Sequence, residues 1–360
     1  MVSAGARAVK PRRTVRAEVQ RRAIQGFAPH VPGQEGARVP DLLPLRVLGT
    51  GEALPERIVT TAEVAALCGL PADEAERRSG VRTRHWVTDD EDPLELGLLA
   101  ARRALAAAGL DTVDVVLNAS GTQLQAIPDG GALLAAGLGL DDVSAYSVGA
   151  TCLSFLFALQ EAGFLLATHR ADTVLIVSTD CGSRGIDPGQ PESALLFGDA
   201  AAAVLIGRAE TPGQGLVTTH FRTRSSGVRH AELRGFGSRI RVEEAPDRLA
   251  DFRFDMQGKA LLVDALRHFP AFLEEVRPGL STGLPGIDRV VPHQTSAAGL
   301  EGMARLWGRD RMTITLGEVG NTIGSAIPLA LHRSRVQPGE SVLLVGTGAG
   351  THYGAVVLQA

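Results

Sequence analysis

The sequence predicts an α/β fold made of two similar halves, and three observations support this prediction. The chain has 360 residues, of which 44% are hydrophobic, so it can form a large core. From about Leu45 to the C-terminus, short apolar runs typical of strands alternate with longer helical patterns. Segments of the first half also resemble segments of the second half. We therefore expect an extension over residues 1–44, a first half over residues 45–215 and a second half over residues 216–360.

The first elements of the regular part follow from local patterns. LRVLGTGEALP (45–55) predicts a strand that runs into a glycine and proline turn. TTAEVAAL (60–67) predicts a helix that starts at a hydroxyl N-cap with an acid in the first turn. PLELGLLAARRALAAAGL (93–110) predicts a strong helix that ends at Gly109. VDVVLNAS (113–120) then predicts a strand that is buried on both faces.

A weak internal repeat connects the two halves. LDTVDVVLNASGTQ (110–123) resembles LPGIDRVVPHQTSA (284–297) in strand position and turn. ADTVLIVSTDCGSRG (171–185) resembles GESVLLVGTGAGTHYG (339–354) in the same way, and a further apolar strand follows each of them. Such a repeat predicts two halves that pack together, with sites at the strand ends between them.

Composition excludes several classes of function. The net charge of -4 argues against a nucleic-acid-binding protein, and no apolar run approaches the roughly 18 residues of a membrane span. The three cysteines lie far apart, which fits a reducing cytoplasm and neither a disulfide framework nor a zinc site. The first 40 residues are basic, then rich in glycine and proline; we expect a partly ordered extension, with a basic arm for acidic partners as the alternative.

The segment GATCLSFLFAL (149–159) contains a candidate nucleophile. Cys152 follows a turn of small residues and directly precedes an apolar helical run. Unpaired N–H groups and the positive end of the helix dipole favour a thiolate at such a position. The small residues would let a substrate carbonyl approach the sulfur. The alternative is that Cys152 is a small, buried hydrophobic residue.

His293 and Asn321 are the other candidate catalytic residues. His293 follows an apolar strand by one proline, so its ring is expected at a strand end; a structural or surface histidine is the alternative. Asn321 precedes an apolar segment among glycines, where a turn asparagine is the alternative. A Cys-His-Asn set can activate a thiol or place two donors on a developing oxyanion.

The glycine-rich segment GTGAG (346–350) follows the strand SVLLV. No G-x-G-x-x-G there opens a helix with an acid about 20 residues further on, so the pattern argues against NAD binding. Backbone N–H groups of this turn could serve as oxyanion donors.

Taken together, these segments resemble the thiolase superfamily, specifically the 3-oxoacyl-ACP synthase III (KAS III) family. The resemblance covers roughly residues 45–360, and its motifs occur in the family's order and at about its spacing. They are SGVRTRHWV (79–87), GATC (149–152), LLFGDAAAAVL (195–205), PHQ (292–294), GNTIGSAIPLAL (320–331) and GTGAG (346–350).

The resemblance implies a homodimer with the five-layered αβαβα thiolase fold. It implies that Cys152 accepts an acyl group from a CoA or carrier-protein thioester. His293 and Asn321 would then bind the carbonyl of a malonyl thioester, whose loss of CO2 gives the enolate that attacks the acyl group. Backbone N–H groups of Cys152 and Ala349 would form the oxyanion hole. No metal or other cofactor is implied.

The resemblance also implies substrate contacts from Ile127, Arg82, Arg184 and Gly348. Ile127 stands where the partner subunit often inserts an aromatic residue into the acyl pocket. A smaller residue there is expected to admit a longer or branched acyl chain.

Two further departures from the family pattern concern the carrier of the substrate. Glu74 or Ala75 stands where the family commonly has a tryptophan that stacks on the CoA adenine, which favours a carrier-protein thioester over free CoA. The first arginine after PHQ is Arg305, so docking of the carrier protein is expected to differ. These departures suggest a specialised member, for example of a natural-product pathway.

Three functions remain open on the sequence alone. The favoured one is a decarboxylating condensing enzyme, because Asn321 supplies a second neutral oxyanion donor beside the histidine. The second is an acyltransferase that moves the acyl group from Cys152 to an amine or hydroxyl without loss of CO2. The third is a non-catalytic scaffold subunit, against which the complete Cys-His-Asn set argues.

Overall fold

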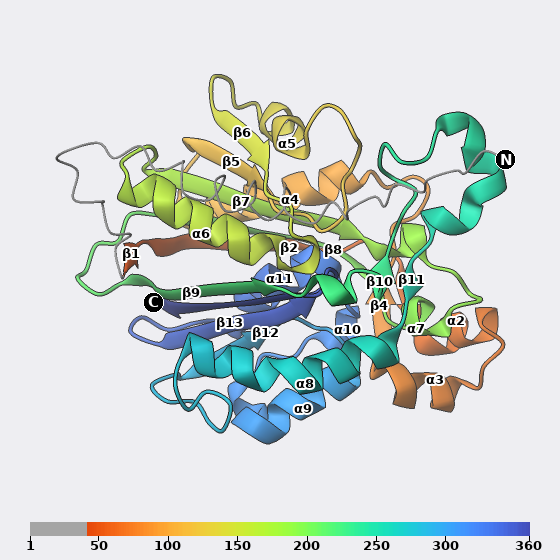
Figure 1. The fold of residues 1–360 in the computed structure, drawn as a ribbon. Coiled ribbons are helices and arrows are strands. Elements are labelled where there is room, and N and C mark those ends of the chain that lie inside the picture. Colours follow the sequence, from red (N-terminus) through yellow and green to blue (C-terminus); the bar gives the residue numbers. More distant parts are fainter. Residues whose placement is uncertain (1–41) are drawn as a thin grey trace, which may run out of the picture. The chain divides into compact units, whose positions relative to one another are not determined.

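The computed structural model describes residues 42–360, which contain two five-stranded sheets with helices packed on them (Figure 1). The basic segment of the predicted extension lies outside the described residues. In spatial order, the first sheet consists of β2 (Arg46–Ala53), β8 (Asp199–Gly207), β7 (Thr173–Cys181), β5 (Val115–Asn118) and β6 (Ser144–Ser147). The second consists of β1 (Leu43–Pro44), β9 (Gly215–Thr223), β14 (His352–Gln359), β13 (Ser341–Gly348) and β12 (Arg289–Pro292).

The two sheets repeat one arrangement of strands. Each has a parallel pair, β5 with β7 or β12 with β13, extended by two antiparallel strands, β8 and β2 or β14 and β9. An aspartate joins each parallel pair at the start of its strands: a carboxylate oxygen of Asp114 accepts from the backbone N–H of Thr173 at 2.9 Å, and one of Asp288 accepts from that of Ser341 at 2.8 Å. The internal repeat seen in the sequence is therefore a repeat of the structure.

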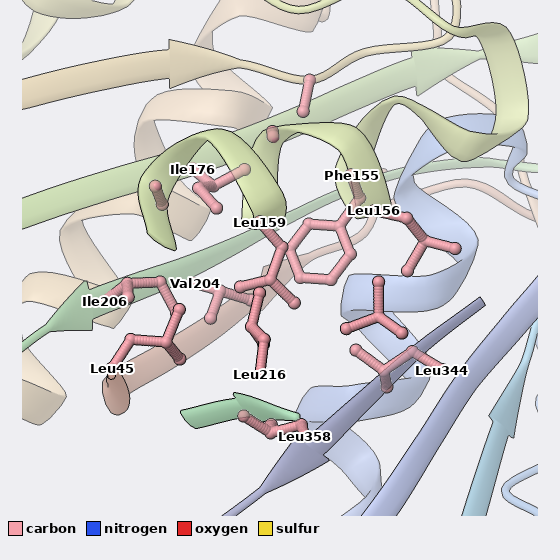
Figure 2. Packing of buried hydrophobic residues seen from close by; sticks show 14 of the residues in the cluster. Leu45, Phe155, Leu156, Leu159, Ile176, Val204, Ile206, Leu216, Leu344 and Leu358 are labelled. Atoms are coloured by element: carbon pink, nitrogen blue, oxygen red, sulfur yellow. The ribbon is translucent and has the colours of Figure 1, made fainter. Parts of the chain in front are cut away.

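Two helices lie between the sheets and form the central layer, α6 (Ser154–Ala167) and α11 (Ala326–Ser334). Figure 2 shows Phe155, Leu156 and Leu159 of α6 packed against side chains of both sheets. Side chains alternate along each strand, so that Ile176 of β7 and Leu344 of β13 point into this central core. Contact with both sheets explains why most residues of the helix that follows Cys152 are apolar.

The outer layers are also helical. α4 (Pro93–Ala108) and α5 (Gly130–Leu138) cover the first sheet, and α8 (Gly258–Val276) and α9 (Ala297–Trp307) cover the second. The order is therefore helices, sheet, helices, sheet, helices, which confirms the five-layered αβαβα fold. Apart from 3₁₀ helices, the remaining described elements are α2 (Thr61–Leu67), α3 (Ala72–Ser79), α7 (Pro191–Ala194), α10 (Leu316–Val319), the pair β3 (Ile58–Thr60) with β4 (Thr83–His85), and the pair β10 (Ala231–Glu232) with β11 (Asp255–Met256).

Local signals in the sequence place two helix ends correctly. Thr60 is the N-cap of α2: its side chain accepts from the backbone N–H of Glu63, whose carboxylate accepts from the N–H of Thr60 in return. Gly109 is the C-cap of α4 and has a φ of 67°, in the left-handed region that glycine adopts most readily.

The two central helices begin in the same way. Each follows a short 3₁₀ turn, Thr151–Leu153 before α6 and Ile323–Ser325 before α11, and the two turns contact each other. In the first, the Ser154 hydroxyl donates to the carbonyl of Thr151 at 2.8 Å, and in the second the Ser325 hydroxyl donates to that of Thr322 at 2.7 Å. The N-terminal ends of two helices from different halves thus meet between the sheets.

Candidate active site

Cys152 is the middle residue of the 3₁₀ turn that leads into α6. The turn is tightly held, because the Ser154 hydroxyl donates to the carbonyl of Thr151 and accepts from the N–H of Ala150 at 2.9 Å. Thr151 has a φ of 51°, an uncommon conformation for a β-branched residue, which is typical of functional turns. Leu153 is fully buried and anchors the other side of the nucleophile.

The electrostatic environment of Cys152 differs from the sequence expectation of a favoured thiolate. Cys152 is partly exposed to an internal cavity but surrounded by protein, and this burial raises the pKa of its thiol to about 11. The nearby carboxylate of Asp180 adds to the rise, whereas hydrogen bonds to the sulfur from the N–H groups of Ala349 and Cys152 itself oppose it. Burial outweighs these hydrogen bonds, and the raised pKa favours the thiol at neutral pH.

His293 lies directly after β12 and is only 2% exposed. Its Nε2 lies 3.2 Å from the carbonyl oxygen of Ile323, which can only accept, so Nε2 carries the proton. Its Nδ1 has no hydrogen-bond partner among the described residues. Burial lowers the pKa of His293 to about 4, which makes the ring a neutral hydrogen-bond donor at neutral pH.

Two neighbours fix the position of His293. The Gln294 side chain is fully buried; it accepts from the N–H of Leu316 at 3.0 Å and donates to the carbonyl of Pro292 at 2.8 Å. Gly346 of β13 lies against the histidine, since a Cβ there would come within 2.5 Å of the His293 Cβ. The first glycine of GTGAG is therefore explained by close approach of the catalytic candidate.

The backbone of Asn321 is held where two loops cross. Asn321 forms a parallel bridge with Phe197, and its carbonyl accepts from the N–H of Gly198 at 3.1 Å. A Cβ on Gly198 would lie 2.0 Å from the backbone oxygen of Val319, so this crossing requires glycine.

The side chain of Asn321 is oriented as a donor. Its Oδ1 accepts from the N–H of Ile323 at 2.9 Å, which fixes the plane of the amide. Its Nδ2 then faces the carbonyl of Thr295 at the long distance of 3.4 Å. This NH2 group and the Nε2–H of His293 are two neutral donors held by the same turn, because Ile323 contacts both side chains.

Sequence reasoning missed Asp180, at the end of β7. This carboxylate is fully buried and accepts from the N–H of Thr122 at 2.7 Å and from the N–H of Ser325 at 3.0 Å. It thereby ties a loop of the first half to the turn before α11. Burial raises its pKa to about 6, although the hydrogen bonds, including one from the N–H of Gly121, act against this. The available signal was a charged residue at the end of an apolar strand.

One cavity of about 1370 Å³ brings the candidates together. Cys152, His293 and Asn321 all line it, as do Ala349, Gly348 and Arg184. The other two predicted substrate contacts lie elsewhere. Arg82 is exposed and does not line the cavity, and Ile127 is 87% exposed on the surface of the chain.

Known proteins similar to this chain indicate one enzyme family. Residues 146–225 match the family model of 3-oxoacyl-[acyl-carrier-protein (ACP)] synthase III, and residues 282–360 match the model of its C-terminal part. A beta-ketoacyl-[acyl-carrier-protein] synthase III from Sphingopyxis alaskensis is 32% identical over 321 residues, which cover 86% of this chain and 97% of that protein. The chain belongs to the 3-oxoacyl-ACP synthase III family.

Solved structures of this family agree with the fold. A 3-oxoacyl-(acyl carrier protein) synthase III from Pseudomonas aeruginosa PAO1 is 29% identical with a TM-score of 0.77, covering 88% of this chain and 98% of that one. The priming beta-ketosynthase of the R1128 polyketide pathway is 26% identical with a TM-score of 0.78, covering 90% and 98%. Both comparisons support the thiolase-type architecture.

The position expected to face the adenine of CoA, Glu74 or Ala75, lies on α3. Ala75 is on the buried face of α3, and Glu74 is solvent-accessible and paired with Arg78 at 3.4 Å. Neither residue provides a flat apolar face for an adenine, and Arg78 itself lines the cavity.

The part of the chain that the structure describes shows neither a metal-binding group nor a membrane-spanning helix. Within residues 42–360, no group of three or more histidine, cysteine or acidic residues could hold a metal ion. Among the helices of this same range, none has both the length and the apolar content that crossing a membrane requires.

Proposed function

We propose that this chain is a condensing enzyme that joins an acyl group to a malonyl-type thioester with loss of CO2. Family membership and the cavity shared by Cys152, His293 and Asn321 support the proposal. The observation that carries it is the pair of neutral donors, His293 Nε2–H and Asn321 Nδ2, in the cavity of a buried cysteine.

In the first step, the sulfur of Cys152 attacks the carbonyl carbon of an acyl thioester. A new C–S bond forms, the thiol of CoA or of the carrier protein leaves, and the proton of Cys152 passes to that leaving thiol. The N–H groups of Cys152 and Ala349, which bond to the resting sulfur, would turn to the tetrahedral oxyanion beside it and hold it.

In the second step, a malonyl thioester occupies the cavity with its carbonyl oxygen against His293 and Asn321. The bond to the carboxylate breaks and CO2 leaves, and the electron pair becomes an enolate that the two donors stabilise. The enolate carbon attacks the acyl carbonyl, a C–C bond forms, and the sulfur of Cys152 departs as a thiolate that then takes up a proton from water. A neutral histidine suits this role, because an imidazolium would bind the malonyl carboxylate and hold it back.

The test separates the two steps in one set of variants. Intact-protein mass after incubation with acyl-CoA and acyl-carrier thioesters is expected to show an acyl gain in the wild type and none in Cys152→Ala. His293→Ala is expected to keep the acyl gain and to lose CO2 release from a malonyl thioester. Retained condensation in the histidine variant would remove its assigned role.

The alternative, transfer to an amine or hydroxyl, predicts discharge of the acyl group without CO2. Stoichiometric CO2 from the malonyl thioester decides against it. No adduct with any donor would instead revive a non-catalytic scaffold.

Substrates and assembly are also part of the proposal. The partners are an acyl-CoA or acyl carrier protein and a malonyl thioester, and the surface position of Ile127 is compatible with insertion into a partner subunit of a homodimer. Arg184 and Gly348 would contact substrate in the cavity. Arg82, which lies outside the cavity lining, would contact substrate beyond it. The free thiols of Cys68, Cys152 and Cys181 fit a cytoplasmic enzyme. Sedimentation at micromolar concentration tests the dimer.

A further inference from the structure

One loop of the first half is held by two buried side chains of the motif SGVRTRHWV. Arg84 lies on β4 and is fully buried, and Trp86, which directly follows that strand, is 7% exposed. The guanidinium Nη2 of Arg84 donates to the carbonyl of Leu195 at 3.0 Å, and the indole N–H of Trp86 donates to that of Phe197 at 3.1 Å. Residues 195–198 are therefore fixed from the side of β4.

The same loop also binds the backbone of Asn321. The carbonyl of Leu196, which lies between the two acceptors just named, accepts from the N–H of Asn321 at 2.9 Å. The N–H of Gly198 donates to the carbonyl of Asn321 at 3.1 Å. The loop thus connects the side chains of Arg84 and Trp86 to the backbone of a candidate catalytic residue.

The two backbones touch at this crossing without side chains between them. A Cβ on Gly320, whose φ is 71°, would lie 2.7 Å from the backbone oxygen of Leu196. A Cβ on Gly198 would lie 2.0 Å from that of Val319. Close-packed interiors transmit displacements, because they contain few voids that could absorb them. A shift of the loop is therefore expected to move Asn321.

Arg84 is a costly group to bury. Its Nη2 also donates to the hydroxyl of Thr61 at 2.8 Å, but in the described part of the chain its Nε and Nη1 have no hydrogen-bond partner. Burial lowers the pKa of Arg84 to about 10. An apolar side chain of similar volume would fill this place without desolvating a charge. Groups that break a packing rule in this way occur at sites where their position serves the function.

We propose that Arg84 and Trp86 are positioning residues for Asn321. Through residues 195–198 they hold its amide where it binds the malonyl carbonyl during loss of CO2. This inference rests on the proposed function, because it names residues that act in its second step. The first step depends on the turn that contains Cys152, which has its own hydrogen bonds, so acylation is expected to be independent of both positioning residues.

The two tryptophans of the chain provide a matched pair of variants. Trp307, at the end of α9, is 5% exposed, and its indole N–H donates to the carbonyl of Leu280 at 2.9 Å. It does not line the cavity of Cys152. Trp86→Phe and Trp307→Phe therefore remove the same group from similarly buried sites, and only the first site is connected to Asn321.

Both variants are assayed for acylation of Cys152 by intact mass with an acyl-CoA, and for CO2 release at a saturating concentration of malonyl thioester. Trp86→Phe is expected to keep acylation and to release CO2 about 10- to 100-fold more slowly, because a misplacement of about 1 Å has effects of this size. Trp307→Phe is expected to match the wild type in both assays. Unchanged CO2 release in Trp86→Phe, an equal loss in both steps, or an equal loss in Trp307→Phe overturns the proposal.

A double variant separates positioning from a general effect on the structure. Asn321→Ala alone is expected to slow CO2 release by about 100- to 1,000-fold, the range for removal of one oxyanion donor. If Trp86 acts through Asn321, adding Trp86→Phe to Asn321→Ala slows the reaction no further, since the two residues share one effect. The same fractional loss with and without Asn321 contradicts the proposal.

Arg84→Met tests the proposal independently, including the case in which Trp86→Phe does not fold. The substitution removes the donor to Leu195 together with the buried charge, and apolar replacement of buried charges is often neutral for stability. It is expected to keep acylation, to slow CO2 release and to add nothing to Asn321→Ala; additive losses overturn the proposal. Failure of the proposed function differs from these results, because the wild type itself then yields neither an acyl adduct nor CO2.

Discussion

The pH dependence of Cys152 reactivity tests whether burial or the helix N-terminus governs the nucleophile. Burial raises the pKa of its thiol from 9.0 to about 11, which corresponds to about 2.7 kcal/mol against the thiolate. At pH 7 the thiolate fraction is then about one in ten thousand, compared with about one in a hundred for an unperturbed thiol. A thiolate of higher pKa is intrinsically more nucleophilic, so the expected loss of rate is about tenfold.

The assay is alkylation by iodoacetamide, followed by mass spectrometry of the peptide that contains Cys152, with N-acetylcysteine as the reference thiol. Between pH 7 and pH 10 the rate at Cys152 is expected to rise about tenfold per pH unit, without a plateau, because the thiolate fraction grows in proportion. A plateau below pH 9 would refute the reasoning, since it would mean that the helix dipole and the N–H groups of Cys152 and Ala349 outweigh burial.

Three further predictions concern stability. Gly198→Ala is expected to lower the free energy of unfolding in urea by about 1–3 kcal/mol, because its Cβ would lie 2.0 Å from the oxygen of Val319. Gly302→Ala, whose Cβ would meet no atom within 4 Å, is expected to raise this free energy by up to about 1 kcal/mol. Equal unfolding free energies of the two variants would contradict the steric argument. Thr60→Ala removes the capping box of α2 and should lower the free energy of unfolding by about 1 kcal/mol in the same assay. An unchanged free energy of unfolding would show that the capping box does not stabilise the protein. The pKa of His293 falls from 6.5 to about 4, so the unfolded chain binds more protons between these values and stability rises with pH. From pH 5 to pH 7 the free energy of unfolding of the wild type should rise by about 2 kcal/mol more than that of His293→Gln. Parallel curves of unfolding free energy against pH for the two proteins would rule out this titration.

Local patterns were sufficient for much of the fold. The helix that ends at Gly109 and the capping box at Thr60 depend on neighbours within one turn, so the sequence predicts them directly. The internal repeat predicts two related sheets, because apolar runs of strand length recur in the same order. The sequence also indicates Cys152, His293 and Asn321, each at a turn between an apolar strand or loop and a buried segment.

Other properties of the site depend on contacts between distant segments. Asp180 acts on Thr122 and Ser325, which are 58 and 145 positions away, so its role has no local signature. The raised pKa of Cys152 has the same origin: the helix N-terminus that favours a thiolate is visible in the sequence, but the protein that surrounds the sulfur is not.

The sequence by itself determined the α/β class, the repeat, the family and a candidate nucleophile, because periodicity and short motifs are local properties of the chain. Only the tertiary structure decided that two 3₁₀ turns from different halves meet, that His293 is neutral, and that one cavity brings the three candidate residues together. The physical reason is that desolvation and cavity shape are sums over atoms that the chain brings together from many positions. Such sums exist only after the sheets and helices have packed.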